Sequence, residues 1–270
     1  MASEELVNLS IEESIAVLTL DHPSNGNALS AQMTTAIRDR FVSLHREQSV
    51  RAIVLRANGK HFCTGVDLAG NSALAPEASD LGPVGRVYRS QEHLAEMILA
   101  IHECDKPVIA AIQGAAVGGG LAIALACDLR IAGTSARFGA VFQRLGLSNC
   151  DVGVSYFLPR IIGPTRASEV MLTGELFSST DADRFGMLNA LVDDSEVAET
   201  AMRLARQIAR NSEYGVWMTK RGMWLGLDAS SLRQAMETEN RTQVLGSFVG
   251  NVEVGAAAFF TKTEPEWKPL

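Results

Sequence analysis

Cysteine and histidine are few in this chain of 270 residues, and neither is arranged as a metal site. The four cysteines (Cys63, Cys104, Cys127 and Cys150) form no CxxC pair, and the five histidines are scattered without ligand spacing. No bound metal is therefore expected. A chain of this length can bury enough apolar surface to fold without disulfides, so we expect reduced thiols and a cytoplasmic protein.

Excess basic charge is also lacking. The net charge is −7, and an acidic protein repels nucleic acids and anionic membrane surfaces, so neither is expected as a partner. The first residues, MASEELVNLS, contain neither the basic start nor the apolar run that a secretory signal needs. No secretory signal is expected.

One stretch without charge, residues 107–127, is long enough to cross a membrane. Its sequence is PVIAAIQGAAVGGGLAIALAC, in which Pro107, Gln113 and three consecutive glycines interrupt the apolar run. We therefore predict a buried strand, turn and helix here rather than a membrane span.

What the chain does contain is an alternation of strand-like and helix-like segments, with hydrophobic residues making up 47% of the sequence. Residues 6–13 and 15–23 have the pattern of strands, and residues 50–59 are rich in β-branched and apolar residues. Between them, residues 31–47 have helical spacing, with Ser30 as a plausible N-cap. This order predicts a layered α/β fold with a large core.

A segment from Asn71 to about Arg89 departs from this alternation. It is rich in Gly, Ala, Ser and Pro and shows no periodicity, so it is predicted to be a mobile loop or lid. A helix over residues 90–102 is expected to follow it.

The end of the chain is different again. From Ser195 onward the pattern is helical, with one break at Gly246–Gly250. We therefore expect an α/β core over residues 1–205 and a helical region over residues 206–270, although no linker composition marks the boundary.

Two glycine-containing turns are candidates for binding negative charge: residues 63–67, CTGVD, and residues 117–121, VGGGL. Backbone N–H groups at the start of a helix carry partial positive charge, and glycine lets a ligand approach them closely. The second turn lies between a predicted strand and a predicted helix, so it suits a phosphate or a developing oxyanion. Most glycine triplets serve close strand–helix packing instead, so the triplet alone is weak evidence for a site, and neither GxxxxGK[ST] nor GxGxxG is present.

Longer segments around these turns resemble the crotonase family, the enoyl-CoA hydratases and isomerases. The resemblance rests on HFCTGVDL, KPVIAAIQGAAVGGGLAIALACDLRIA and ARFGAVFQRLGLS, in this order, and extends from HPSNGNALS to AFFTKTEPEW. It implies an α/β fold built as a spiral of ββα units. It also implies that the helical C-terminal region, residues 206–270, forms trimers or a dimer of trimers.

The same resemblance implies an acyl-CoA substrate whose thioester oxygen lies between the backbone N–H groups of Val66 and Gly119. Two such donors can stabilise an enolate, each contributing roughly 3 kcal/mol in a site without water. No cofactor is implied, since coenzyme A is part of the substrate. The other residues that it places at the substrate are Asn25, Asn27 and Ala28 on the adenine side, Cys63, Gly65, Asp67, Gly118 and Phe142 around the thioester, and Lys262 near the CoA phosphates, where relatives often supply it from a neighbouring subunit.

The two glutamates that hydratases of this family use are missing. The position after the glycine turn is Ala122, and the position in the next loop is Phe142. Hydration by a pair of carboxylates needs both a base for water and an acid for carbon. Two-glutamate hydration is therefore not expected here.

The segment GLSNCDVGVSY, residues 146–156, contains one carboxylate, Asp151. Some isomerases and dehalogenases of the family carry an aspartate in this turn, but here the turn is one residue longer. Matching backwards from LPRIIG places Asp151 at the catalytic position, whereas matching forwards from GLS places Cys150 there. We favour Asp151; as an alternative role, its side chain could cap a helix beginning near Val152, which is worth about 1 kcal/mol.

These observations predict an isomerase in which Asp151 shuttles a proton along the acyl chain while Val66 and Gly119 hold the enolate. An apolar wall that includes Phe142 would raise the pKa of the carboxyl toward neutrality. Two other functions remain open. The chain could be a hydratase in which Asp151 orients water, or an acyl-CoA binding protein without catalysis.

Overall fold

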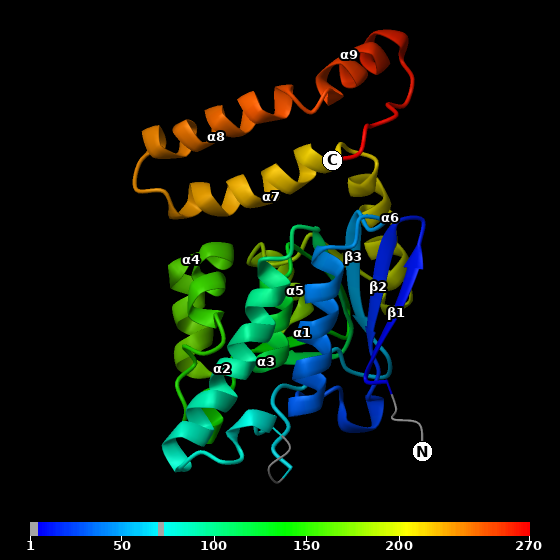
Figure 1. Ribbon diagram of the computed structural model, residues 1–270. Helices are drawn as coiled ribbons and strands as arrows, with labels where there is room; N and C mark the ends of the chain where they lie inside the picture. The colour runs from blue at the N-terminus through cyan, green and yellow to red at the C-terminus, as the bar shows by residue number, and fades with distance from the viewer. Residues whose placement is uncertain (1–4, 70–72) are drawn as a thin grey trace.

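The computed structural model describes residues 5–69 and 73–270, and its central element is a mostly parallel sheet of six strands (Figure 1). β1 pairs with β2 as an antiparallel hairpin, and the remaining neighbours pair in parallel. The strands, in their order across the sheet, are β1 (Val7–Glu12), β2 (Ile15–Leu20), β3 (Ala52–Ala57), β4 (Val108–Ile112), β6 (Leu129–Gly133) and β9 (Ala190–Val192).

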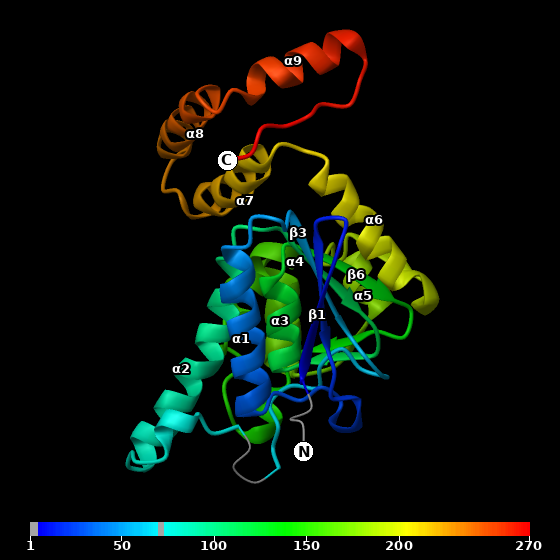
Figure 2. The same cartoon turned by 45° about the vertical axis from the view of Figure 1, so that its right-hand side comes forward.

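The helices cover both faces of this sheet, as Figure 2 shows with α1 and α3 on one side and α6 on the other. Short 3₁₀ turns at residues 23–25, 76–78, 142–145 and 194–196 join some of the elements. The helices are α1 (Ala31–His45), α2 (Pro83–His102), α3 (Gly119–Ala126), α4 (Val154–Thr173), α5 (Ser179–Arg184), α6 (Val197–Ala209), α7 (Glu213–Asp228), α8 (Leu232–Ser247) and α9 (Asn251–Thr261).

Side chains of the central strands alternate between two cores. Leu18 and Leu55 belong to the core on the α1–α3 side, whereas Val17 and Val54 pack with α6. Successive residues of a strand point to opposite faces, and a parallel sheet covered on both sides needs apolar residues at every position. This explains why β2 is buried along its whole length.

Pairs of strands followed by a helix form the repeating unit predicted for the core. β4 lies in the large sheet and is followed by β5 (Ala115–Val117), which lies in a second, three-stranded sheet, and then by α3. β6 and β7 (Arg137–Gly139) repeat this pattern before α4, and β5 pairs with β7 in parallel. The α/β spiral of ββα units is confirmed, and so is the strand, turn and helix within residues 107–127.

The predicted loop from Asn71 to Arg89 is partly wrong. α2 begins at Pro83, seven positions before the start expected from the sequence, and residues 76–78 form a 3₁₀ turn. Proline is favoured at the first helical position because its missing N–H has no partner there. The first two turns of α2 expose Val84, Val87 and Tyr88, so no core-facing periodicity marked them as helical. The start of the predicted loop, residues 71 and 72, lies outside the described residues.

The last three helices form a separate layer above the core (Figure 1). Within α7 and α8 the only buried side chain is that of Lys220, whose Nζ lies 2.8 Å from Asp128 Oδ2 and so joins the layer to the core. The expected boundary at residue 205 falls inside α6, which packs on the sheet, so the division of the chain into two regions remains a proposal.

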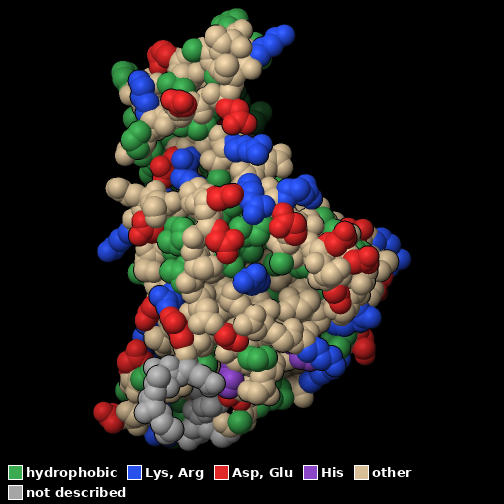
Figure 3. Space-filling view, turned by 90° about the vertical axis from the view of Figure 1, so that its right-hand side faces the viewer, with side chains coloured by type: hydrophobic (Ala, Val, Ile, Leu, Met, Phe, Trp, Pro, Cys, Tyr) green, Lys and Arg blue, Asp and Glu red, His purple; other side chains and the backbone are tan. Residues whose placement is uncertain are grey.

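Charged side chains of both signs are mixed on the face shown in Figure 3. Among the described helices, none alone is long and apolar enough to span a membrane. α8 and α9 pass that test only as a pair, and they are bent by 78° relative to each other.

Candidate active site

The first glycine-containing turn is held by two β-bridges, which pair Cys63 with Ala116 and Leu29 with Val66. Leu29 N donates to Gly65 O at 2.8 Å, and Asp67 N donates to Leu29 O at 3.1 Å. Val66 lies between Gly65 and Asp67, whose backbone groups both bond to Leu29. In such a parallel bridge the N–H of the middle residue points away from the partner strand. Within the described chain, the N–H of Val66 has no protein acceptor, so it is available to a ligand.

The second turn places Gly119 at the start of α3. Gly118 precedes it with φ 54° and ψ −121°, a conformation open essentially to glycine alone. The N–H of Gly119 belongs to the first turn of the helix, where no backbone acceptor exists, and it has no protein partner among the described residues. Gly120 is needed for a different reason, because a Cβ atom there would lie 2.2 Å from Cys63 O.

The two turns lie directly against each other. A Cβ atom on Gly65 would be 3.0 Å from Val117 O and 3.5 Å from Gly119 N. The available N–H groups of Val66 and Gly119 therefore flank one place, the arrangement that stabilises negative charge on an oxygen. This is the geometry expected of an oxyanion hole.

A narrow cavity adjoins these two residues. Among the described residues that line it, Asp151 supplies the one carboxylate and the others are apolar or glycine. The residues that line it are Leu29, Val66, Leu94, Met97, Ile98, Gly119, Phe142, Asp151 and Val152. The predicted oxyanion residues and the predicted acid thus meet in one cavity.

The carboxylate of Asp151 is held through a single oxygen. Oδ1 accepts the N–H of Val152 at 2.8 Å and a hydrogen bond from Gln91 Nε2. Oδ2 has no hydrogen-bond partner among the described residues. The side chain does not cap α4, whose N-cap is Gly153, so the alternative role as a helix cap is wrong.

Burial raises the pKa of the Asp151 carboxyl above its ordinary value, and the hydrogen bonds from Val152 and Gln91 oppose this rise only in part. The apolar wall disfavours the charged form, whereas donors to the carboxylate favour it. A raised pKa suits a group that must both accept and return a proton. The direction agrees with the sequence-based expectation.

Backbone strain accompanies this carboxylate. Val152 has φ 37°, a left-handed conformation that is costly for a β-branched side chain. Such outliers persist only where the surrounding structure enforces them, and they concentrate at functional sites. Here Val152 turns the chain between Asp151 and α4, so that Asp151 faces the cavity.

The extra residue in this turn is accommodated on the surface. Cys150 is exposed and does not line the cavity, and its N–H bonds to Ser148 Oγ at 3.0 Å. Asn149 is buried and donates to Met171 O at 2.6 Å. Of the two residues that the sequence left as alternatives, the structure brings Asp151 and not Cys150 to Val66 and Gly119.

The residues expected on the adenine side form a rigid turn. Asn27 is fully buried, and its Nδ2 donates to Asn58 O at 3.0 Å and to His61 O at 2.8 Å. Asn25 Nδ2 donates to Asp67 Oδ2 at 3.2 Å, which connects this turn to the first glycine-containing turn. Asn27 and Asp67 therefore shape this turn, in which Asn27 and Ala28 are both buried.

Of the predicted substrate residues only Phe142 is among the described residues that line the cavity, and Cys63 and Lys262 have other surroundings. The Cys63 side chain is fully buried in the core, and burial raises the pKa of its thiol to about 12, so it is inert. Lys262 is the C-cap of α9 and lies beside Phe259, Phe260 and Trp267, and α9 belongs to the layer above the core (Figure 1). Within one chain it does not join the site.

The positions of the missing glutamates are filled by apolar side chains. Ala122 is 0% exposed in the core, and Phe142 is 6% exposed in the cavity wall. Among the described residues, no group of three or more His, Cys, Asp and Glu is placed to hold a metal ion. Among the described residues that line the cavity, Asp151 is the one acid.

Sequence reasoning missed the contribution of α2. Gln91 contacts Asp151, and one face of the same helix brings Leu94, Met97 and Ile98 to the cavity. Their spacing of three to four residues is the signal that could have identified this face. Gln91 carries no signal of its own, because a polar residue on an exposed part of a helix is ordinary.

Comparison with known proteins identifies the family and the fold. The family model described as enoyl-CoA hydratase/isomerase matches residues 10–269. A probable enoyl-CoA hydratase/isomerase of solved structure from Mycobacterium abscessus is 36% identical, with a TM-score of 0.91 over 97% of this chain and 98% of that one.

Relatives of known sequence include proteins named for different reactions. A probable enoyl-CoA hydratase of Mycobacterium leprae is 37% identical over 90% of this chain and 83% of that protein. The 1,2-epoxyphenylacetyl-CoA isomerase of Escherichia coli is 31% identical over 97% of this chain and 98% of that protein. Hydratases and isomerases are thus both similar to this chain.

Proposed function

The chain belongs to the enoyl-CoA hydratase/isomerase family, and we propose that it moves a double bond within the acyl group of a coenzyme A thioester, with Asp151 as the proton shuttle. The observation that carries this proposal is the meeting of Asp151, Val66 and Gly119 in one apolar cavity. No second acid faces that cavity among the described residues that line it, so chemistry based on a carboxylate pair is not supported.

The reaction begins with the thioester oxygen between the N–H groups of Val66 and Gly119. Asp151 takes a proton from the carbon next to the carbonyl, and the electron pair of that C–H bond moves onto the thioester oxygen. The two N–H donors stabilise the resulting dienolate, with loss of one donor costing roughly a hundredfold or more in rate. The protonated carboxyl then returns its proton to the far end of the conjugated system, which leaves the double bond shifted and Asp151 ionised again.

The wall of the cavity favours an apolar acyl group. Leu29, Leu94, Met97, Ile98 and Phe142 offer no hydrogen bond to a substituent near the reacting carbons. Their removal from water on binding stabilises the complex by roughly 25 cal/mol for each Å² of apolar surface buried. A water-poor site also strengthens the attraction between the enolate and the two N–H dipoles.

Hydration is the second candidate, because a relative named as a probable enoyl-CoA hydratase is 37% identical to this chain and the isomerase is 31% identical. In that reaction Asp151 would orient and deprotonate a water molecule while Val66 and Gly119 bind the same thioester oxygen. One carboxylate would then have to do what two glutamates do elsewhere in the family. We therefore expect hydration to be the slower of the two activities.

We propose that coenzyme A lies along the turn formed by Asn25–Ala28, with Lys262 reaching its phosphates from a neighbouring subunit. α7–α9 support such an assembly, since they expose many large apolar side chains and α8 buries none in one chain. These side chains are Met223, Leu225, Leu227, Leu232, Met236, Val244, Leu245, Phe248, Val252, Phe259 and Phe260. A trimer or a dimer of trimers in the cytoplasm, with its four free thiols reduced, is our proposal for the working enzyme.

A direct assay tests the proposed reaction. Purified protein is given 3-enoyl-CoA and, separately, 2-enoyl-CoA, and the products are separated by chromatography. We expect conversion between these isomers in the wild type and a loss of roughly a thousandfold or more in Asp151→Asn, since general acid–base groups contribute about 10²–10⁴-fold. Cys150→Ser, which alters the exposed neighbour, is the matched control and should retain activity.

Other outcomes discriminate between the candidates. Formation of 3-hydroxyacyl-CoA faster than isomerisation would favour the hydratase. Tight binding of acyl-CoA without any product would favour the binding protein. Activity retained in Asp151→Asn and lost in Cys150→Ser would contradict the assignment of the acid.

A further inference from the structure

A hydrogen bond between Gln91 and Asp151 joins two segments that lie sixty positions apart in the chain. The two oxygens of the Asp151 carboxylate are used unequally. Both donors to the carboxylate, Gln91 Nε2 and the N–H of Val152, reach Oδ1. We propose that Gln91 is a positioning residue that anchors Oδ1, so that Oδ2 is the oxygen that takes and returns the proton. This inference rests on the proposed function of Asp151 and assigns a role within it.

The bond from Val152 cannot orient the carboxylate alone. It comes from the next residue in the chain, which is itself in a strained conformation at φ 37°. A single donor leaves the carboxylate free to swing about that bond. A second donor that reaches the same oxygen from a different element fixes both the direction of the carboxylate and the identity of the free oxygen.

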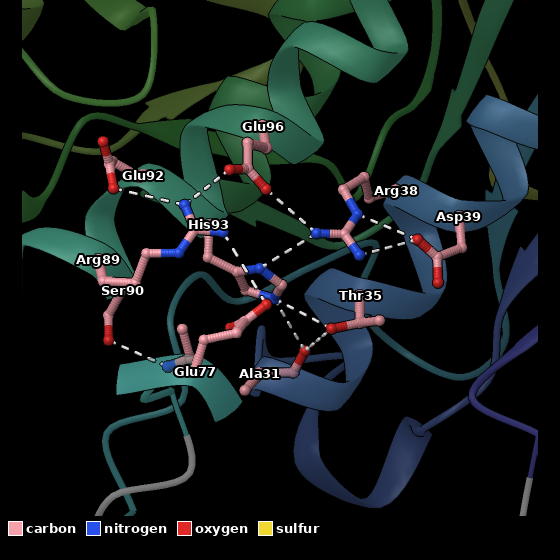
Figure 4. A network of polar contacts seen from close by, with 11 residues as sticks. Ala31, Thr35, Arg38, Asp39, Glu77, Arg89, Ser90, Glu92, His93 and Glu96 are labelled. Atoms are coloured by element: carbon pink, nitrogen blue, oxygen red, sulfur yellow. Dashed lines mark hydrogen bonds and ion pairs between the residues drawn. The ribbon is translucent and has the colours of Figure 1, made fainter. Parts of the chain in front are cut away.

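α2 presents Gln91 from a fixed position, as Figure 4 shows for its neighbours. Ser90 Oγ accepts the N–H of Ala75 at 3.0 Å. The ring of His93 is buried between the helices, with Nε2 at 3.0 Å from Thr35 Oγ1 and 3.3 Å from Ala31 O. Ser90 and His93, on either side of Gln91, are thereby bonded to other elements. The backbone of α2 that carries the Gln91 side chain is therefore held in place.

Ion pairs strengthen this attachment of α2 to α1. Arg38 lies 3.1 Å from Glu96 Oε2, and Arg89 lies 2.7 Å from Glu96 Oε1 (Figure 4). Exposed pairs contribute little one by one, but a network around a shared carboxylate holds its members in one geometry. None of these charged groups lines the cavity, so the charge of Asp151 is governed by burial and by its two donors.

The role predicts a specific kinetic signature. Gln91→Met keeps the length of the side chain and removes the donor. We expect kcat to fall roughly tenfold or more, because a misdirected base loses its near-attack geometry, while KM changes by less than about twofold. The loss of a donor to the ionised form should also move the acidic limb of the kcat/KM profile to higher pH.

Gln91→Glu supplies the rescue experiment. Below the apparent pKa of the new pair of carboxyls, one shared proton restores a donor to Asp151, whereas above it two like charges repel. We therefore expect this variant to recover activity toward acidic pH and to lose it toward alkaline pH. Leu99→Ala, at an exposed position of the same helix, is the control and should match the wild type in kcat, KM and pH profile.

A measurement without substrate separates this inference from the proposed function. The infrared band of the Asp151 carboxylate is titrated as a difference against Asp151→Asn, in the wild type and in Gln91→Met. A pKa that rises in Gln91→Met supports the contact even if the wild type isomerises nothing. An unchanged pKa together with unchanged kcat in Gln91→Met overturns the positioning role while the shuttle itself stands.

Discussion

Gly65 lies against the backbone of Gly119, so closely that a Cβ atom added to Gly65 would be 3.5 Å from Gly119 N and 3.0 Å from Val117 O. This contact sets the separation of the two turns that carry the N–H donors. Gly65 also has φ +92°, which an alanine tolerates poorly. The width of the proposed oxyanion hole is therefore set by the absence of a side chain at this position.

Gly65→Ala is expected to spread the two turns. We predict that kcat/KM falls by roughly a hundredfold, as for loss of one oxyanion donor, whereas the free energy of unfolding falls by only about 1–3 kcal/mol. Steady-state kinetics and thermal unfolding measure the two effects. Gly82→Ala is the control, because a Cβ atom there meets nothing within 4 Å and it should leave kcat/KM unchanged.

Phe142 is expected to keep water from Asp151. Phe142→Ala removes part of the apolar wall, so the carboxylate should be better solvated and its raised pKa should fall toward the ordinary value. The acidic limb of the pH profile should then move to lower pH. The same change should cost about 3 kcal/mol of stability through the cavity it leaves, and an unmoved limb would show that burial by Phe142 is not the cause.

The ion pair between Lys220 and Asp128 is expected to hold the C-terminal layer. Their side chains are 7% and 12% exposed, and Lys220 also donates to Lys106 O at 3.1 Å. Lys220→Met leaves Asp128 buried without its partner, which typically costs about 3–5 kcal/mol. Chemical unfolding should show this loss, and limited proteolysis should cut near α7 first.

The matched control for that pair is a double variant. In Lys220→Met/Asp128→Asn no uncompensated charge remains, so the double variant should be more stable than Lys220→Met alone. Equal stability of the two would show that the charge on Asp128 is not what the lysine compensates.

Asp151 should lower the stability of the protein at neutral pH. Burial raises its pKa in the folded state, so the folded protein binds more protons than the unfolded chain between the two pKa values. The free energy of unfolding therefore decreases as pH rises through that window. Asp151→Asn should melt a few degrees above the wild type at neutral pH, and the difference should shrink below the pKa of the unfolded aspartate.

Most of the sheet could be predicted from the sequence because burial leaves a strong pattern in it. β2 and β3 are apolar along nearly their whole length, and Ser30 accepts the N–H of Met33 as an N-cap does. The first turns of α2 could not be predicted, because their apolar residues face outward and mimic a loop. A helix without a buried face lacks the periodicity that identifies helices.

The parts of the candidate site that are formed by backbone groups and glycines could be predicted from the sequence. The turns around Gly65 and Gly119 are recognisable in the chain, since only glycine permits their conformation and close approach. Gln91 was not, because a contact between segments sixty positions apart depends on how α2 packs against α1 and the core. The strain at Val152 likewise exists only once the cavity has formed.

Hydrogen exchange into the substrate tests the central claim most directly. A 3-enoyl-CoA with an apolar acyl group is incubated in deuterated water with the wild type, with Asp151→Asn and with Cys150→Ser, and the products are read by mass spectrometry and NMR. We predict that the wild type and Cys150→Ser shift the double bond and exchange protons at C2 and C4, the two ends of the dienolate, while Asp151→Asn does neither. Equal exchange with Asp151→Asn would contradict the assignment of Asp151 as the proton shuttle.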